Sequence, residues 1–204
     1  MYLFKNYVNS CSPENTKLYF AGELLQLVKD ETKQVRQVAF TSLTNLLNVY
    51  DDKYKSEMLL SYYLGWIRSP PNDIYKLLVE RFGEIFFYLP IKKEDHIHCL
   101  IHFFVNATKD NTPEVREYCA FNFPAVVKCV GTKRYEKHLH ASMVALCEDP
   151  SVSVRKRISK GFHEIVKLLS DNGTAKLLKN IFFSFLTVSI QCHLSSLHFI
   201  GCQP

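Results

Sequence analysis

Two histidines and a cysteine on a predicted helix are the residues best suited to chemistry in this sequence. His98 and His102 are four residues apart, so a helix places them on one face, with Cys99 adjacent. Two imidazoles at this spacing resemble half of a zinc site. No H-E-x-x-H sequence and no second ligand cluster completes that site. We therefore expect no metal and no cofactor.

Other candidates for catalysis are equally incomplete. The pairs His96/His98 and His138/His140 are two residues apart, so they point to different helix faces. The sequence contains no nucleophile motif and no phosphate-binding loop. We expect no catalytic residues, and hence a protein that is not an enzyme.

The net charge of +5 is spread along the chain and does not mark a nucleic-acid surface. The densest basic cluster is typical of a solvated helix face, so no nucleic-acid partner is expected. That cluster consists of Arg155, Lys156, Arg157 and Lys160.

Composition predicts one continuous globular unit in a reducing compartment. The 204 residues are 47% hydrophobic and 22% charged, which is an ordinary balance. Seven cysteines without a C-x-x-C pair, and an N-terminus without a signal peptide, favour a cytoplasmic location. The tail 181–200 is apolar, but its Gln191, His193 and His198 make it a poor membrane span.

An internal repeat organises the helices of this protein. The pattern Asp-x4-Val-Arg occurs three times and has a weaker copy around Ile74. The anchor residues Val35, Ile74, Val115 and Val154 are 39, 41 and 39 residues apart, the period of two-helix HEAT or armadillo units.

Apolar residues follow each anchor at offsets 4, 8, 11 and 12, which is one face of an α-helix. These second helices should span about 32–50, 72–90, 112–130 and 151–170. Thr32, Thr112 and Ser151 stand where a hydroxyl would cap the helix start, and Pro124 predicts a kink. The expected core positions are Ala39, Leu43, Leu46, Leu47, Leu78, Phe82, Ile85, Phe86, Cys119, Phe123, Val126, Val127, Ile158, Phe162, Ile165 and Val166.

These patterns predict an all-α HEAT-repeat α-solenoid, a right-handed superhelix of antiparallel helix pairs, over residues 1–180. Full repeats should cover about 14–50, 53–90, 92–130 and 133–170, with partial repeats at 1–9 and from 173. Residues 181–204 form a divergent tail. Both ends lack polar caps, so we expect a fragment that aggregates when isolated, through Phe4, Tyr7, Ile181, Phe182 and Phe185.

The turn motif followed by an amphipathic helix resembles the HEAT repeats of phosphatase scaffold and regulatory subunits. The segments that carry the resemblance are 30–47 and 115–169, and the likeness extends over roughly 15–180. It implies a non-catalytic regulator that binds a PP4- or PP2A-type serine/threonine phosphatase catalytic subunit and its substrates. The alternative is a generic HEAT adaptor, such as a transport receptor or cytoskeletal regulator.

The resemblance also implies roles for the motif residues. Their side chains would form an Asp–Arg ladder between adjacent turns, either as Arg116 with Asp149 or as Asp110 with Arg155. The second turn, 68–73, lacks this motif at Ser69 and Tyr75. The expected ladder residues are Asp30, Arg36, Asp110, Arg116, Asp149 and Arg155.

The same family binds partners along the turns within each repeat, here 29–33, 68–73, 109–113 and 148–151. The second turn stands out because two prolines make it rigid and the single tryptophan precedes it. Trp66 is either an anchor for a partner or part of the core between repeats. The candidate protein-binding residues are Trp66, Arg68, Pro70, Lys29, Lys33 and Lys109.

Overall fold

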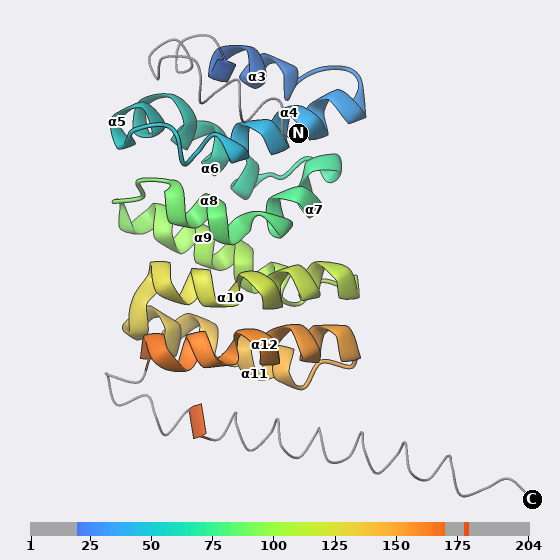
Figure 1. Ribbon diagram of the computed structural model, residues 1–204, viewed down its shortest axis with the longest axis vertical. Coiled ribbons are helices and arrows are strands. Elements are labelled where there is room, and N and C mark those ends of the chain that lie inside the picture. The colour runs from blue at the N-terminus through green and yellow to red at the C-terminus, as the bar shows by residue number, and fades with distance from the viewer. Residues whose placement is uncertain (1–19, 170–177, 180–204) are drawn as a thin grey trace, which may run out of the picture. The chain divides into compact units, whose positions relative to one another are not determined.

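The structure is a computed structural model that describes residues 20–169 and 178–179 (Figure 1). Within these ranges every regular element is helical and no strand occurs, which confirms the all-α class for this part of the chain. The elements are α3 (Ala21–Leu27), α4 (Lys33–Asn45), α5 (Asp52–Tyr54), η2 (Lys55–Leu59), α6 (Leu60–Arg68), α7 (Asn72–Glu80), α8 (Phe82–Tyr88), α9 (Glu94–Ala107), α10 (Pro113–Arg134), η3 (Tyr135–Leu139), α11 (His140–Cys147) and α12 (Val152–Leu169).

The chain forms two compact units, residues 1–104 and 105–204. Among the described residues of both, no helix is long and apolar enough to cross a membrane. The predicted partial repeats at 1–9 and from 173, the tail 181–204, and the aggregation-prone side chains Phe4, Tyr7, Ile181, Phe182 and Phe185 lie outside the described residues. The predicted repeat boundaries stay a prediction.

In unit 1, the predicted second helix over 72–90 is interrupted at one residue. Arg81 has φ −101° and ψ 8°, which separates α7 from α8. Hydrogen bonds from Arg81 N to Leu77 O and from Ile85 N to Arg81 O, both 3.0 Å, continue the helical path across it. The Arg81 side chain donates to Asn45 Oδ1 and pairs with Glu84 at 2.7 Å, contacts that no periodicity reveals.

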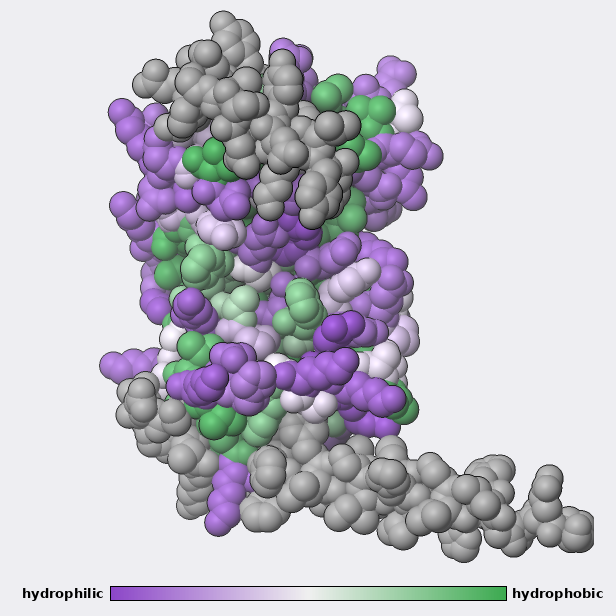
Figure 2. Space-filling model, in the orientation of Figure 1, coloured by the Kyte–Doolittle hydropathy of each residue, from purple (hydrophilic) through white to green (hydrophobic). Residues whose placement is uncertain are grey.

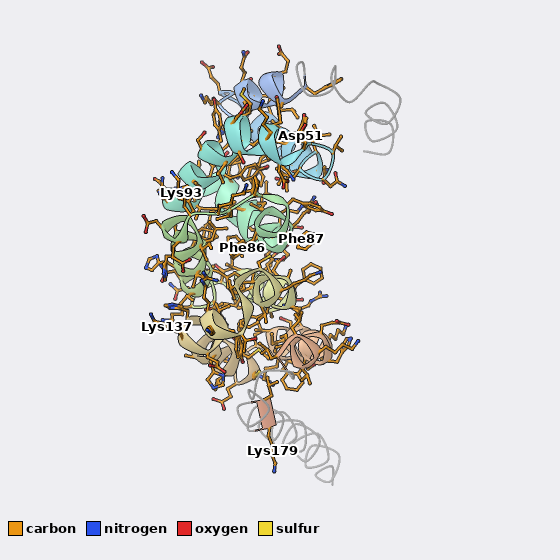
Figure 3. All side chains as sticks on the ribbon, turned by 90° about the vertical axis from the view of Figure 1, so that its left-hand side faces the viewer. Asp51, Phe86, Phe87, Lys93, Lys137 and Lys179 are labelled. Carbon is orange, nitrogen blue, oxygen red and sulfur yellow. The ribbon has the colours of Figure 1, made fainter. Side chains whose placement is uncertain are left out.

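The core of unit 1 lies where the sequence places it. Every predicted core position of α4, α7 and α8, and of the turn after α4, is under 9% exposed, and each buried leucine, isoleucine or phenylalanine contributes about 1.5–3 kcal/mol. Aromatic rings add directional contacts: Phe82 stacks on Phe104 at 5.3 Å and meets Phe103 at 5.3 Å. At the end of α8, Phe86 is 5% exposed and Phe87 is 50% exposed (Figure 3).

Unit 2 is built around α10 and α12, which pack along each other (Figure 1). Its predicted core positions are buried except Phe162 and Val166, which are half-buried. The expected kink at Pro124 is not where the backbone departs from helical geometry. That departure is at Gly131 (φ 77°, ψ 171°), a conformation that glycine adopts without a steric penalty.

Two short π-helical segments, η2 and η3, were not predicted, because apolar spacing does not distinguish a π-turn from an α-turn. They lie two repeat periods apart and each leads into an α-helix, α6 and α11 respectively. Lys55 at the start of η2 is buried, and its ammonium group pairs with Asp52 Oδ1 at 2.9 Å.

Candidate functional site

The turn before α4 is organised by one aspartate and one arginine. Asp30 Oδ1 accepts a hydrogen bond from the Thr32 N–H at 2.7 Å. Arg36 Nη1, one turn into α4, donates back to Asp30 O at 2.7 Å and to Glu31 O at 2.8 Å. The guanidinium therefore satisfies turn carbonyls that have no helical partner.

The same geometry recurs at the turn before α10. Asp110 Oδ1 accepts from Thr112 N–H at 2.7 Å, and Arg116 Nη1 donates to Asp110 O at 2.7 Å and Asn111 O at 3.2 Å. The predicted hydroxyl caps are wrong, because Thr32 and Thr112 make no side-chain cap hydrogen bond. The aspartate two residues earlier forms an Asx turn with the backbone instead.

The turn before α12 repeats the arrangement once more. Asp149 Oδ1 accepts from the Ser151 N–H at 2.8 Å, and Arg155 Nη1 donates to Asp149 O at 2.6 Å and Pro150 O at 3.0 Å. The Ser151 hydroxyl lies 3.0 Å from that of Ser153. Identical hydrogen bonding at all three motif copies shows that the Asp-x4-Val-Arg spacing encodes a defined turn.

Within unit 2, two of these turns are joined by an ion pair. Arg116 Nε donates to Asp149 Oδ2 at 2.7 Å and Nη2 donates to Oδ1 at 3.0 Å, a bidentate contact. Asp149 is 5% exposed. Burial acts to raise the pKa of Asp149, but hydrogen bonds from Arg116 and Ser151, with the charges of Arg116 and Arg155, hold it below the usual value. The hydrogen bond to Asp149 raises the pKa of Arg116.

Unit 1 contains a corresponding pair that the sequence analysis missed. Arg36 Nε donates to Asp73 Oδ2 at 2.8 Å, and Gln37 Nε2 donates to Asp73 O at 2.9 Å. The second turn lacks an aspartate five residues before its anchor, but Asp73, directly before Ile74, supplies the carboxylate. A search for any acid near each anchor would have found it.

The predicted protein-binding residues differ in their surroundings. Trp66 is half-buried and its ring meets Phe40 at 5.4 Å and Tyr63 at 5.1 Å, both edge-on. Arg68 is exposed as the last residue of α6, and Pro70 is half-buried.

The three predicted lysines, Lys29, Lys33 and Lys109, are exposed at turns or helix starts. The Lys29 ammonium group lies 5.5 Å from the centre of the Tyr62 ring, a cation–π geometry. Lys29 and Lys33 belong to unit 1, whereas Lys109 belongs to unit 2.

One histidine of α9, His98, lies close to a glutamate. His98 Nε2 lies 3.5 Å from Glu94 Oε1, one turn earlier on the same helix. Within the described ranges, no group of histidine, cysteine, aspartate and glutamate has the arrangement of a metal site.

The structure thus describes an all-helical protein with recurrent aspartate–arginine turns. No model of a known family matches the chain. Its relatives include serine/threonine-protein phosphatase 4 regulatory subunit 4 of Mus musculus and of Homo sapiens, each 28% identical over a 192-residue alignment that covers 81% of this chain. The chain spans only 22% of either relative's length. These matches confirm the resemblance to phosphatase regulatory subunits as a distant relationship.

Proposed function

We propose that this chain is part of a non-catalytic regulatory or scaffold subunit of a PP4- or PP2A-type serine/threonine phosphatase. The observation that carries the proposal is the 28% identity to a phosphatase 4 regulatory subunit across 81% of the chain. The expected cytoplasmic location belongs to the same proposal.

The repeated turn geometry supports a HEAT-type α-solenoid as the architecture of this subunit. Each Asp-x4-Val-Arg copy closes its turn with the same hydrogen bonds. Arg36 also reaches Asp73 at the start of α7, and Arg116 reaches Asp149 in the turn before α12. A stack of similar helix pairs uses such contacts to keep successive units in register. The right-handed superhelix over residues 1–180 and its repeat boundaries are parts of this proposal.

The turns are the contact surface that we propose for the catalytic subunit. Their backbone is restrained by the Asp and Arg side chains, so binding costs little conformational entropy. In unit 1, exposed Arg68 follows Trp66 by two residues on α6, and the Trp66 ring packs against Phe40 and Tyr63. Arg68 has no ion-pair partner among the described residues, which leaves its guanidinium available for a carboxylate on another protein.

An affinity pull-down of the tagged chain, followed by mass spectrometry, tests the proposed partner. Recovery of a PP4- or PP2A-type catalytic subunit, repeated with the purified proteins by surface plasmon resonance, supports the phosphatase function. Recovery of Ran or tubulin without any phosphatase subunit would instead identify the generic HEAT adaptor. Failure of the purified catalytic subunit to bind would overturn the proposal.

A further inference from the structure

Phe121 on α10 is the most exposed large apolar side chain described in unit 2, at 60% exposure. It stands six residues after the anchor Val115, and the same position in the other second helices holds Thr41, Glu80 and Lys160. The packing of these helices therefore does not require an aromatic ring here. A single exposed ring is common on protein surfaces, so its neighbours decide whether it has a use.

A cation from the neighbouring helix is fixed over this ring. The Arg157 guanidinium carbon on α12 lies 5.6 Å from the centre of the Phe121 ring. Arg157 Nη2 and Nε also donate to Glu117 Oε1, at 3.0 Å and 3.2 Å. Because Glu117 holds the guanidinium in place, Phe121 and Arg157 form a prearranged apolar and cationic pair.

Half-buried Pro124 extends the apolar surface beside this pair. Pro124 lies one helical turn after Phe121 and faces Gly161 of α12, where a Cβ atom would approach Pro124 Cγ to 2.9 Å. Because Gly161 has no side chain, its backbone packs closely against one side of the Pro124 ring, and the ring stays half-buried rather than covered. Phe121 and Pro124 therefore form a short apolar line along α10.

Two lysines give the same surface an excess of positive charge. Lys156 and Lys160 are exposed, lie one turn apart on α12, and have no acidic partner among the described residues. The nearest acids on these helices are already engaged: Glu117 with Arg157, and Glu164 with His163 at 2.8 Å and Lys167 at 3.5 Å. Figure 2 shows hydrophilic side chains in a band across α12.

We propose that Phe121, Pro124, Lys156, Arg157 and Lys160, here called the α10/α12 strip, bind an acidic peptide segment of another protein. An apolar side chain of the peptide would pack on Phe121 and Pro124, and its carboxylates would pair with Lys156 and Lys160. This strip is separate from the turns assigned to the catalytic subunit, so the inference stands independently of the proposed function.

Charge complementarity favours an acidic peptide as the partner of the α10/α12 strip. The segments of this chain outside the described residues contain only Glu14 and Asp171 as acids, too few to cover the strip with carboxylates. A nucleic acid is the alternative occupant, and the oligonucleotide arm of the experiment below distinguishes it from an acidic peptide. An acidic peptide with an apolar side chain matches both the charge and the exposed ring.

Fluorescence anisotropy of the whole chain tests the strip. The probe is a fluorescein-labelled peptide with glutamates on both sides of a leucine–phenylalanine pair, compared with a peptide in which lysines replace the glutamates. We expect binding of the acidic probe alone, weakened by added salt. The variant Lys156→Glu/Lys160→Glu should weaken it about tenfold or more, and Phe121→Ala about threefold to tenfold.

A matched control keeps the net charge change and moves it elsewhere. The variant Lys133→Glu/Lys137→Glu alters two exposed lysines of the same unit, and Lys137 lies on the side of that unit away from α12 (Figure 3). It should bind the probe with unchanged affinity, and all variants should melt like the wild type. Equal weakening by the control pair, tighter binding of a single-stranded oligonucleotide, or a dimer mediated by Phe121 in light scattering would each overturn the proposal.

Discussion

Gly161 of α12 faces Pro124 of α10 so closely that a Cβ atom on Gly161 would lie 2.9 Å from Pro124 Cγ and 3.5 Å from Cδ. Both atoms belong to a ring that cannot rotate away, so the glycine sets how closely the two helices approach. The contact explains why a helix of unit 2 tolerates a residue of low helix propensity at this position.

The first prediction concerns this contact. Alanine has the higher helix propensity by about 1 kcal/mol, but overpacking against a rigid ring costs about 1–3 kcal/mol. Gly161→Ala should therefore lower the free energy of unfolding, measured by urea denaturation.

Gly65 of α6 provides the matched control, because a Cβ atom there would meet nothing within 4 Å. Gly65→Ala should be neutral or stabilising. In a double-mutant cycle, Pro124→Ala should remove the penalty of Gly161→Ala, and additive effects of the two substitutions would contradict the steric explanation.

The second prediction compares the two aspartate–arginine pairs. Arg116→Ala leaves the carboxylate of Asp149 buried without its main partner, which should cost about 3–5 kcal/mol of stability. Arg36→Ala should cost less, because Arg36 and Asp73 are 25% and 15% exposed whereas Arg116 and Asp149 are 12% and 5% exposed. Equal losses in chemical denaturation would show that burial does not determine the strength of these pairs.

The third prediction concerns pH. The pKa of Asp149 is lower in the folded protein than in the unfolded chain, so the folded state binds this proton less readily. The associated stability is present above the unfolded pKa of about 3.9 and is lost as pH falls toward the folded pKa.

Denaturation curves recorded between about pH 7 and pH 3 should therefore show a steep loss of stability at the acidic end. Asp149→Asn should be less stable than the wild type at neutral pH and show a shallower acid dependence. If both proteins lose stability in parallel as pH falls, Asp149 does not carry the effect.

The fourth prediction addresses the turn at the end of α6. Arg68 is exposed, so Arg68→Glu should weaken binding to the phosphatase catalytic subunit in surface plasmon resonance without changing the circular-dichroism melt. Lys53→Glu makes the same charge change at another exposed position of unit 1 and should leave binding unaffected. Unchanged binding by Arg68→Glu would exclude Arg68 from the contact, and a collapsed melt would assign it a structural role.

Helix starts and the core could be read directly from the sequence. The second helices were expected to begin at about residues 32, 72, 112 and 151, and they begin at Lys33, Asn72, Pro113 and Val152. Helical periodicity is a local property, and burial follows from it once one face is apolar. The turn at Gly131 and the break at Arg81 were not predicted, because each interrupts a pattern that reads as continuous.

By itself, the sequence determined the all-helical class, the 39–41-residue period and most residues of the core, because these depend on spacing within one or two helices. Only the tertiary structure decided which carboxylate Arg36 reaches, and that Arg157 lies over Phe121. Each of these contacts joins side chains about one repeat apart in the sequence. Their formation depends on the rotation and register of one helix against its neighbour, which packing sets and residue spacing does not.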